Sequence, residues 1–213
     1  MEELFNLFVS KDRLRERYHK PFVYKDKIGA TDTYSMIVTN ATNVSFEITN
    51  THVPPNLDAS LPKENTNELI VVDKDAWEAL KTEDELIEIT PEIECKECDG
   101  EGEVEWTYKY HTEDFDCPVC NGSGIEQKAA YDKTGNKVVG KSLVKIKDAY
   151  FDARLFQRIL SVRDFEKQDL YLISYRDKRS AAMFRCGIFD MLLMPILASE
   201  DTLEDYEHVL KLL

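Results

Sequence analysis

The chain has 213 residues, of which 43% are hydrophobic, 10% aromatic and 32% charged, and its formal net charge is −14. This composition is typical of a globular protein, because it is too apolar for a disordered chain and too charged for a membrane bundle. No run of about 18 uncharged apolar residues exists, so no membrane-spanning helix is expected. The negative net charge argues against a simple nucleic-acid binder.

The chain begins with a segment that fits a cytoplasmic protein. Residues 1–13 have no basic start, apolar stretch or small-residue cleavage site, so a signal peptide is not expected. Residues 4–9 are an apolar run that fits either a strand or a helix. Ser10 can cap a helix over residues 11–20, which ends before Pro21. A hairpin with its turn at residues 25–27 and a further strand are predicted over residues 22–38, and another strand over 44–49.

The next part of the chain alternates short strands and one helix. A polar, Pro-containing loop is predicted over residues 50–67. It is followed by a strand over residues 68–72, a helix over 73–80 and a strand over 85–89, which leads into a cysteine-rich segment.

Four of the five cysteines form two CxxC pairs. Cys95 and Cys98 make the first pair, and Cys117 and Cys120 make the second, with 18 residues between them. Without an export signal, paired thiols are more typical of a metal site than of disulfides. Each pair places two thiolates on one turn, and two such turns complete a tetrahedral zinc site. We therefore predict one structural zinc ion; disulfides, an iron–sulfur centre or a site without metal remain as alternatives.

Glycines extend both pairs into a longer repeat. Residues 95–102 and 117–124 both fit the pattern CxxCxGxG, in which glycine lets amide groups turn toward the sulfurs. Over residues 93–126 the chain resembles the cysteine-rich region of DnaJ-type chaperones. That family has four repeats and two zinc ions, so two repeats imply one zinc here. The His-Pro-Asp signature of a J-domain is absent, so the resemblance implies a zinc hairpin and not a chaperone.

Other residues near the repeats have simpler interpretations. Four thiolates leave no position open for water, which indicates a structural and not a catalytic metal. His111 lies between the two pairs and is an alternative ligand. The alternating residues 103–110 predict a hairpin arm. Cys186 lies in the apolar run MFRCGIF and is predicted to be a small core residue.

The last third of the chain predicts more sheet and two helices. A hairpin is predicted over residues 129–139, around Gly135-Asn136, and a strand over 142–147. Residues 148–160 predict an amphipathic helix. Strands are expected over residues 170–175, 179–185 and 189–195, and a capped amphipathic helix over 199–213. The fold class is α+β, with antiparallel sheet and two amphipathic helices, over residues 11–20 and 148–160, in the main domain.

Two short motifs resemble those of DNA polymerase sliding-clamp domains. Ala30-Thr31-Asp32 is similar to the start of the family's Ala-Thr-Asp-Gly-His-Arg motif, although the Gly-His-Arg portion is lost. Residues 192–196 are similar to the Leu-Met-Pro ending of bacterial clamps. The resemblance covers residues 1–49 and 142–197 and implies one discontinuous clamp-like domain. Residues 50–141 would then be an insertion, and residues 198–213 a C-terminal helix. Clamp rings contain six such domains, so a ring would need six copies or partner subunits.

The charge is distributed unevenly, in a way that fits this resemblance. Residues 28–127 hold 23 acidic and 5 basic residues, whereas residues 11–27 and 128–185 have net charges of +4 and +7. Each basic stretch contains one of the two predicted helices, and the corresponding helices of clamps face DNA. Arg13, Arg17 and Lys20 on the first helix, and Arg154 and Arg158 on the second, are spaced to contact phosphates without reading bases. The alternative is that both helices merely expose basic faces to solvent.

We expect a non-enzymatic, clamp-like protein that associates with duplex DNA without sequence preference and contains a structural zinc site. The alternative is a protein-interaction adaptor that uses the acidic zinc hairpin and the C-terminal helix, without DNA binding. Self-association is possible in either case, and no membrane partner is expected. An enzyme is the third interpretation, but the metalloprotease, serine-hydrolase, P-loop, dinucleotide and deaminase motifs are absent and the four histidines are scattered.

Overall fold

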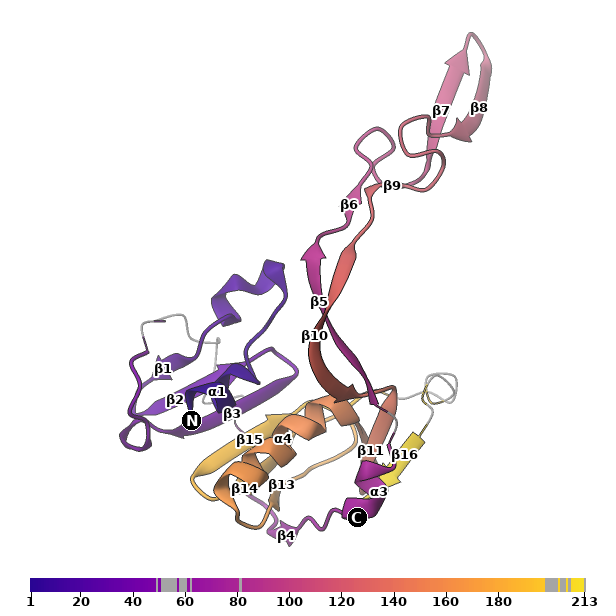
Figure 1. Ribbon diagram of the computed structural model, residues 1–213. Coiled ribbons are helices and arrows are strands. Elements are labelled where there is room, and N and C mark those ends of the chain that lie inside the picture. Colours follow the sequence, from indigo (N-terminus) through magenta and orange to yellow (C-terminus); the bar gives the residue numbers. More distant parts are fainter. Residues whose placement is uncertain are drawn as a thin grey trace. The chain divides into compact units, whose positions relative to one another are not determined.

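The computed structural model describes residues 1–48, 50, 57, 61, 63–80, 82–197, 203, 206 and 208–212. They form two compact units (Figure 1), which we call the body (residues 1–82 and 139–213) and the insert (residues 83–138). The mixed α+β class and the largely antiparallel pairing agree with the prediction.

The body is built on a seven-stranded antiparallel sheet with the order β1-β2-β3-β15-β14-β13-β4 (Figure 1). Its strands are β1 (Phe22–Tyr24), β2 (Lys27–Thr31), β3 (Ser35–Asn40), β15 (Phe189–Leu193), β14 (Ala182–Cys186), β13 (Tyr171–Ser174) and β4 (Glu68–Leu69). At its centre β3 pairs with β15, where Ile37 lies opposite Met191. Segments from the two ends of the chain therefore form one continuous sheet.

Helix α4 (Ala153–Glu166) covers one face of this sheet. The side chain of Asp152 caps its first turn, and Lys167 ends it in a left-handed conformation. The ring of Phe156 packs edge-on against Phe184, with 6.0 Å between centroids. Helix and sheet bury the main apolar core between them, which includes Cys186 as predicted.

The predicted helix over residues 148–160 begins later than expected. Residues Ala149–Asp152 form strand β12, which pairs with β11 (Ser142–Ile146) in a second sheet, and the helix then runs on to Glu166. The alternating burial of β12 places Phe151 in the core from a strand. An apolar residue at position 151 fits the spacing of buried residues in a helix and in a strand, and pairing with β11 selects the strand.

The other helices whose bounds are described are short. They are α1 (Glu2–Asn6), the 3₁₀ helices η1 (Arg13–Tyr18) and η2 (Ala41–Asn43), and α3 (Lys74–Glu78). In the predicted strand at 44–49, residues 44–48 form no strand, but Val44, Phe46 and Ile48 pack against the core; Thr49 lies outside the described residues. No helix among the described residues is long and apolar enough to cross a membrane.

The first predicted amphipathic helix is a kinked 3₁₀ segment. Arg15 has non-helical backbone angles (φ −116°, ψ 38°), and the N-cap Asp12 accepts a hydrogen bond from the backbone of Leu14. The Arg15 guanidinium donates to the carbonyl oxygen of Asp32, 3.2 Å away. This long-range contact competes with regular helix geometry, so Arg17 and Lys20 are not arranged by the spacing of an α-helix.

Asp32, in the turn between β2 and β3, joins the two segments that were predicted to be basic helices. One carboxylate oxygen accepts hydrogen bonds from the backbone N–H groups of Tyr34 and Ser35, at 2.9 and 2.7 Å. The other accepts from the guanidinium of Arg158 on α4. Arg15 donates to the main-chain carbonyl of the same residue, so Asp32 joins η1, the β2–β3 turn and α4 through its backbone and its nearly buried carboxylate together.

The C-terminal helix predicted over residues 199–213 does not extend over residues 208–211. Residues 208–211 form strand β16 (His208–Lys211), which pairs in parallel with β11, so that Leu143 lies opposite Val209. Residues 198–202, 204, 205, 207 and 213 lie outside the described residues. Pairing with β16 satisfies backbone groups along an edge of β11 that would otherwise face solvent, which a helix cannot do.

The insertion is shorter than the predicted range of 50–141. Strand β4 pairs with β13, and Glu68 accepts a hydrogen bond from Lys147 at 2.5 Å. On α3, the ring of Trp77 packs against Phe156. These contacts place residues 68–80 in the body, because their apolar side chains complete its core.

The insert consists of three two-stranded ladders. They are β5 (Thr82–Thr90) with β10 (Ala130–Val139), β6 (Ile93–Glu94) with β9 (Ile125–Gln127), and β7 (Glu103–Tyr108) with β8 (His111–Asp116). The predicted hairpin at Gly135-Asn136 is instead part of one strand: Gly135 has φ +86° but the chain does not reverse. Lys133 and Lys137 both bind Asp84 of β5 and lower its pKa to about 2, so pairing across the ladder overrides the turn signal.

Removing β16 tests the position of the tail. We expect deletion of residues 208–213 to lower the free energy of unfolding by about 3 kcal/mol, because a ladder of about four residue pairs is lost. The oligomeric state should not change. Urea denaturation and light scattering measure the two quantities. Unchanged stability together with loss of an oligomer would instead assign the tail to another molecule.

Candidate metal centre

The four cysteines of the two CxxC pairs meet at one point in the insert. Strands β6 and β9 bring the start of the first CxxCxGxG repeat beside the end of the second. The N–H of Cys95 donates a hydrogen bond to the carbonyl oxygen of Gly124 at 2.8 Å. The N–H of Cys117 donates to Gly102 in the same way, also at 2.8 Å. Each repeat therefore donates one backbone hydrogen bond to the other. All four cysteine side chains are buried.

The spacing of the sulfur atoms is that of ligands around one ion. Cys95 Sγ lies 3.8 Å from Cys117 Sγ, and Cys98 Sγ lies 3.7 Å from Cys120 Sγ. All four sulfurs lie within 4.8 Å of one another. A tetrahedral ion with metal–sulfur bonds of about 2.3 Å requires sulfur–sulfur distances of about 3.8 Å. The four side chains could therefore hold one metal ion.

Two glycines are required because the repeats approach so closely. A Cβ atom on Gly102 would lie 2.5 Å from the carbonyl oxygen of Gly122, and one on Gly124 would lie 2.2 Å from that of Gly100. All four of these glycines also have positive φ. The glycines of CxxCxGxG therefore allow both the turn and the contact between the two turns.

Backbone amides and burial set the protonation of the thiols. The N–H groups of Gly102 and Gly124 donate to Cys98 Sγ and Cys120 Sγ, each at 3.2 Å. Burial raises the pKa of Cys95 to about 11. Burial also opposes ionisation of Cys120, but the hydrogen bond from Gly124 and the neighbouring thiols lower its pKa to about 7. Because metal binding requires thiolates, acidification should favour metal release.

The geometry supports neither His111 as a metal ligand nor disulfide bonds between the cysteines. His111 is the first residue of β8 and pairs with Tyr108, and it is not part of the cysteine group. All five cysteines are free, since the nearest sulfurs in the cluster are far beyond the ~2.05 Å of a disulfide. Cys186 is buried in β14 of the body, and burial there raises its pKa.

Apart from the cysteine cluster, the insert has no buried core. Every one of its residues is described, and besides the four cysteines only Gly102 and Gly124 are buried. Val104 of β7 is the apolar side chain that packs against the cysteines. The cysteine cluster therefore takes the place of a hydrophobic core in this unit, and a metal ion bound there would couple its binding to folding.

The five basic residues predicted to contact DNA have different surroundings. Arg17 and Lys20 are exposed, and the Arg17 guanidinium lies 5.1 Å from the centroid of the Tyr18 ring. Arg154 binds Asp152 at 2.7 Å, and Arg158 binds Asp32 and, at 2.8 Å, the hydroxyl of Ser35. The side chain of Arg13 lies outside the described residues. Arg154 and Arg158 on α4 therefore already have carboxylate partners.

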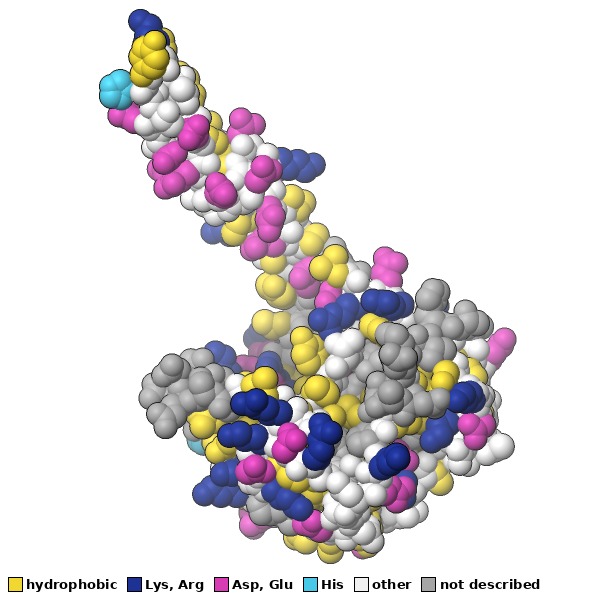
Figure 2. Space-filling model, turned by 180° about the vertical axis from the view of Figure 1, so that it is seen from behind, with side chains coloured by type: hydrophobic (Ala, Val, Ile, Leu, Met, Phe, Trp, Pro, Cys, Tyr) yellow, Lys and Arg dark blue, Asp and Glu magenta, His cyan; other side chains and the backbone are white. Residues whose placement is uncertain are grey.

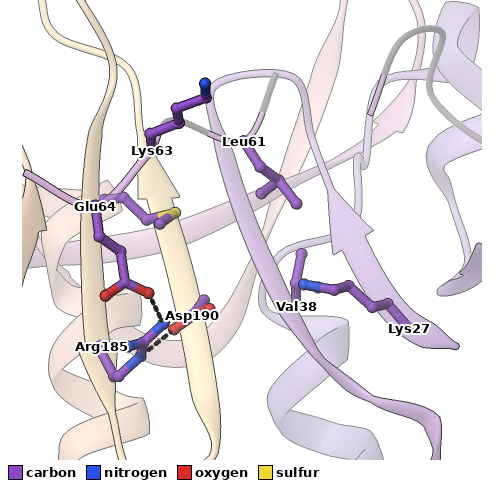
Figure 3. Close-up of a pocket in the computed structure, with 8 residues that line it drawn as sticks. Lys27, Val38, Leu61, Lys63, Glu64, Arg185 and Asp190 are labelled. Carbon is purple, nitrogen blue, oxygen red and sulfur yellow. Dashed lines mark hydrogen bonds and ion pairs between the residues drawn. The ribbon is translucent and has the colours of Figure 1, made fainter. Parts of the chain in front are cut away.

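The body also contains a pocket of about 340 Å³ that sequence reasoning did not predict (Figure 3). It combines an apolar surface with charged groups: Lys27, Val38, Leu61, Lys63, Glu64, Met183, Arg185 and Asp190. Arg185 binds both Asp190 and Glu64 at 2.7 Å, which raises its pKa. The lining offers no histidine, cysteine or serine for catalysis, and its residues are too far apart in sequence to form a motif.

No family model, no curated protein and no solved structure matches this chain.

Comparing two glycines tests the metal centre. We expect Gly124→Ala to weaken metal binding by about tenfold or more. The added Cβ would collide with the backbone of Gly100 and disturb the hydrogen bond from the N–H of residue 124 to Cys120 Sγ. Gly135→Ala is the matched control: this glycine also has positive φ, but nothing lies within 4 Å of the added Cβ. Competition with a coloured chelator measures the affinity. Equal losses in both variants would show that backbone strain alone matters.

Proposed function

We propose that this protein is a non-enzymatic scaffold in which a structural zinc ion holds the insert in a form that docks a partner protein. Four thiolates favour zinc, which prefers tetrahedral sulfur ligation. The thiolates of an iron–sulfur cluster bind different iron atoms and stand farther apart than these sulfurs. The reduced cysteines that such a site needs suit the cytoplasm. Elemental analysis of the purified protein should find about one zinc per chain, and finding iron instead would contradict this assignment.

The observation that carries the docking proposal is the exposed apolar surface of the insert. Trp106 and Tyr108 are 70% and 68% exposed, and Phe115 is 50% exposed. Figure 2 shows hydrophobic side chains along the insert, among many acidic ones. A unit whose only interior is a metal site, and whose large apolar groups face solvent, has the composition of an interaction surface. Four thiolates leave the metal no open position for catalysis.

Site-specific cross-linking in cells that make the protein tests docking. A photoreactive amino acid replaces Tyr110, which is fully exposed at the turn between β7 and β8. The matched control replaces Leu14 of η1, which is 95% exposed in the body. We expect discrete protein adducts from position 110 only, and their loss on Cys95→Ser, because the insert then loses its metal. Equal adducts from both positions, or none from 110, would contradict docking through the insert.

The second candidate function is association of a clamp-like body with duplex DNA. It is supported by the basic side chains that gather on the side of the body seen in Figure 2, and by the exposure of Arg17 and Lys20. The net charge is also divided unequally: the insert holds 16 acidic and 5 basic residues, whereas the body holds 25 acidic and 22 basic residues. Most of the repulsion of phosphates therefore arises in the insert.

The salt dependence of binding tests this candidate. If Arg17 and Lys20 contact phosphates, replacing both by Gln should reduce the slope of log affinity against log salt by about 2. Arg158→Gln should mainly lower stability, because it leaves Asp32 without its cation. Fluorescence anisotropy with a labelled duplex measures the slope. An unchanged slope, or no binding at low salt, would remove DNA from the proposal.

A further inference from the structure

The β7–β8 hairpin of the insert has two chemically different faces. In an antiparallel pair, residues directly opposite share a face, and successive residues along a strand alternate between faces. One face holds three opposed pairs, which are Val104 with Phe115, Trp106 with Glu113, and Tyr108 with His111. The other face holds Glu103 with Asp116, Glu105 with Asp114, and Thr107 with Thr112. An aromatic face and an acidic face therefore lie back to back on a ladder only two strands wide.

The aromatic face is held in place at one end and left uncovered along its length. Val104 packs against the buried cysteines, so the face begins at the metal centre. Beyond it, Trp106, Tyr108 and Phe115 remain at least half exposed. The described residues contain no third strand or helix on this ladder. An isolated two-stranded hairpin is marginally stable in water, so a covering partner would stabilise it.

The charge of the hairpin selects the chemistry of its partner. Residues 93–126 contain ten acidic and two basic residues. A second copy of this segment or a nucleic acid would be repelled, because each would bring further negative charge. A lysine or arginine side chain lying along the aromatic face is long enough to reach carboxylates at the edges of so narrow a ladder.

The hairpin already shows how it accommodates a cation. The ammonium group of Lys109 lies over the ring of Tyr108, 5.3 Å from the centroid. Trp106 is two residues away on the same face, and an indole ring is a stronger acceptor for such a contact than a phenol ring. A basic partner can therefore make at Trp106 the contact that Lys109 makes at Tyr108.

We infer that the aromatic face of β7–β8 binds an extended basic protein segment in which apolar side chains alternate with lysine or arginine. The apolar side chains cover Trp106, Tyr108 and Phe115, and the cations lie against the rings and the flanking carboxylates. This inference rests on the proposed docking function and names its surface and its ligand chemistry.

Binding of defined peptides to the full chain tests the inference. The probe is a labelled ten-residue peptide of alternating Lys and Leu. A Glu-Leu peptide of the same pattern removes the charge complementarity, and a lysine decamer removes the apolar contact. We expect the Lys-Leu peptide to bind, with a blue shift of Trp106 emission, the decamer to bind at least about tenfold more weakly, and the Glu-Leu peptide not to bind. Equal affinity for the decamer, or binding of the Glu-Leu peptide, would overturn the inference.

Matched variants locate the binding surface. Trp106→Thr should raise the Kd of the Lys-Leu peptide about thirtyfold, as expected for a central aromatic anchor. Ile188→Thr, which removes an exposed apolar side chain from the body, should leave the Kd unchanged. Glu105→Gln combined with Asp114→Asn should raise it about tenfold at low salt, and less at high salt. An unchanged metal content confirms that each variant keeps the insert folded.

These outcomes separate the inference from the proposed function. If cross-links from position 110 form in cells but Trp106→Thr does not weaken peptide binding, the insert docks a partner through another surface and the inference fails alone. If the peptide binds as expected but position 110 gives no adducts, the face has the stated chemistry and the docking function fails. Direct binding of a labelled DNA duplex that is lost in Trp106→Thr would contradict the choice of a protein ligand.

Discussion

The close approach of two glycine-containing turns around four cysteine sulfurs is the constraint on which the insert depends. Backbone bonds from Cys95 and Cys117 cross between the turns, and no side chain larger than hydrogen fits at Gly102 or Gly124. Since these residues are also the buried ones, the insert has no second source of tertiary stability. A metal ion bound there supplies what a hydrophobic core supplies elsewhere, and the outer faces of the ladders are left free to vary in chemistry.

The body is stabilised in the opposite way. Its core lies between α4 and the seven-stranded sheet and contains large rings such as Phe156 and Phe184, which are fully buried. Near the edge of this core, Asp32 joins η1 to α4 through Arg15 and Arg158. Charges that looked suited to phosphates are therefore partly used to hold the body together. Arg17 and Lys20 remain exposed to an external anion, and the side chain of Arg13 lies outside the described residues.

The two units thus use charged and aromatic residues for different purposes. In the body, seven phenylalanine rings are fully buried, and Asp32 pairs with Arg158 beside the core. In the insert, Trp106, Tyr108 and Phe115 are at least half exposed, and 16 acidic residues outnumber 5 basic ones. This difference favours an interaction role for the insert, because a chain gains no folding stability from exposed aromatic groups, whereas a partner that covers them gains affinity.

The clustering of the four cysteines could be predicted from the sequence because CxxCxGxG is a local pattern, in which spacing alone brings two thiols to one turn. The α+β class, the core position of Cys186 and most of the strands of the body followed from periodicity in the same way. Tertiary structure decided the rest. Residues 208–211 carry a helical apolar spacing but pair with β11 as a strand, and residues 11–20 lose regular helix geometry where Arg15 reaches Asp32. The role of Arg158 depends on Asp32, a partner distant in sequence, and the division of β7–β8 into two faces depends on register. Local spacing determines which conformations a segment can adopt, whereas long-range hydrogen bonds and ion pairs determine which one it does adopt.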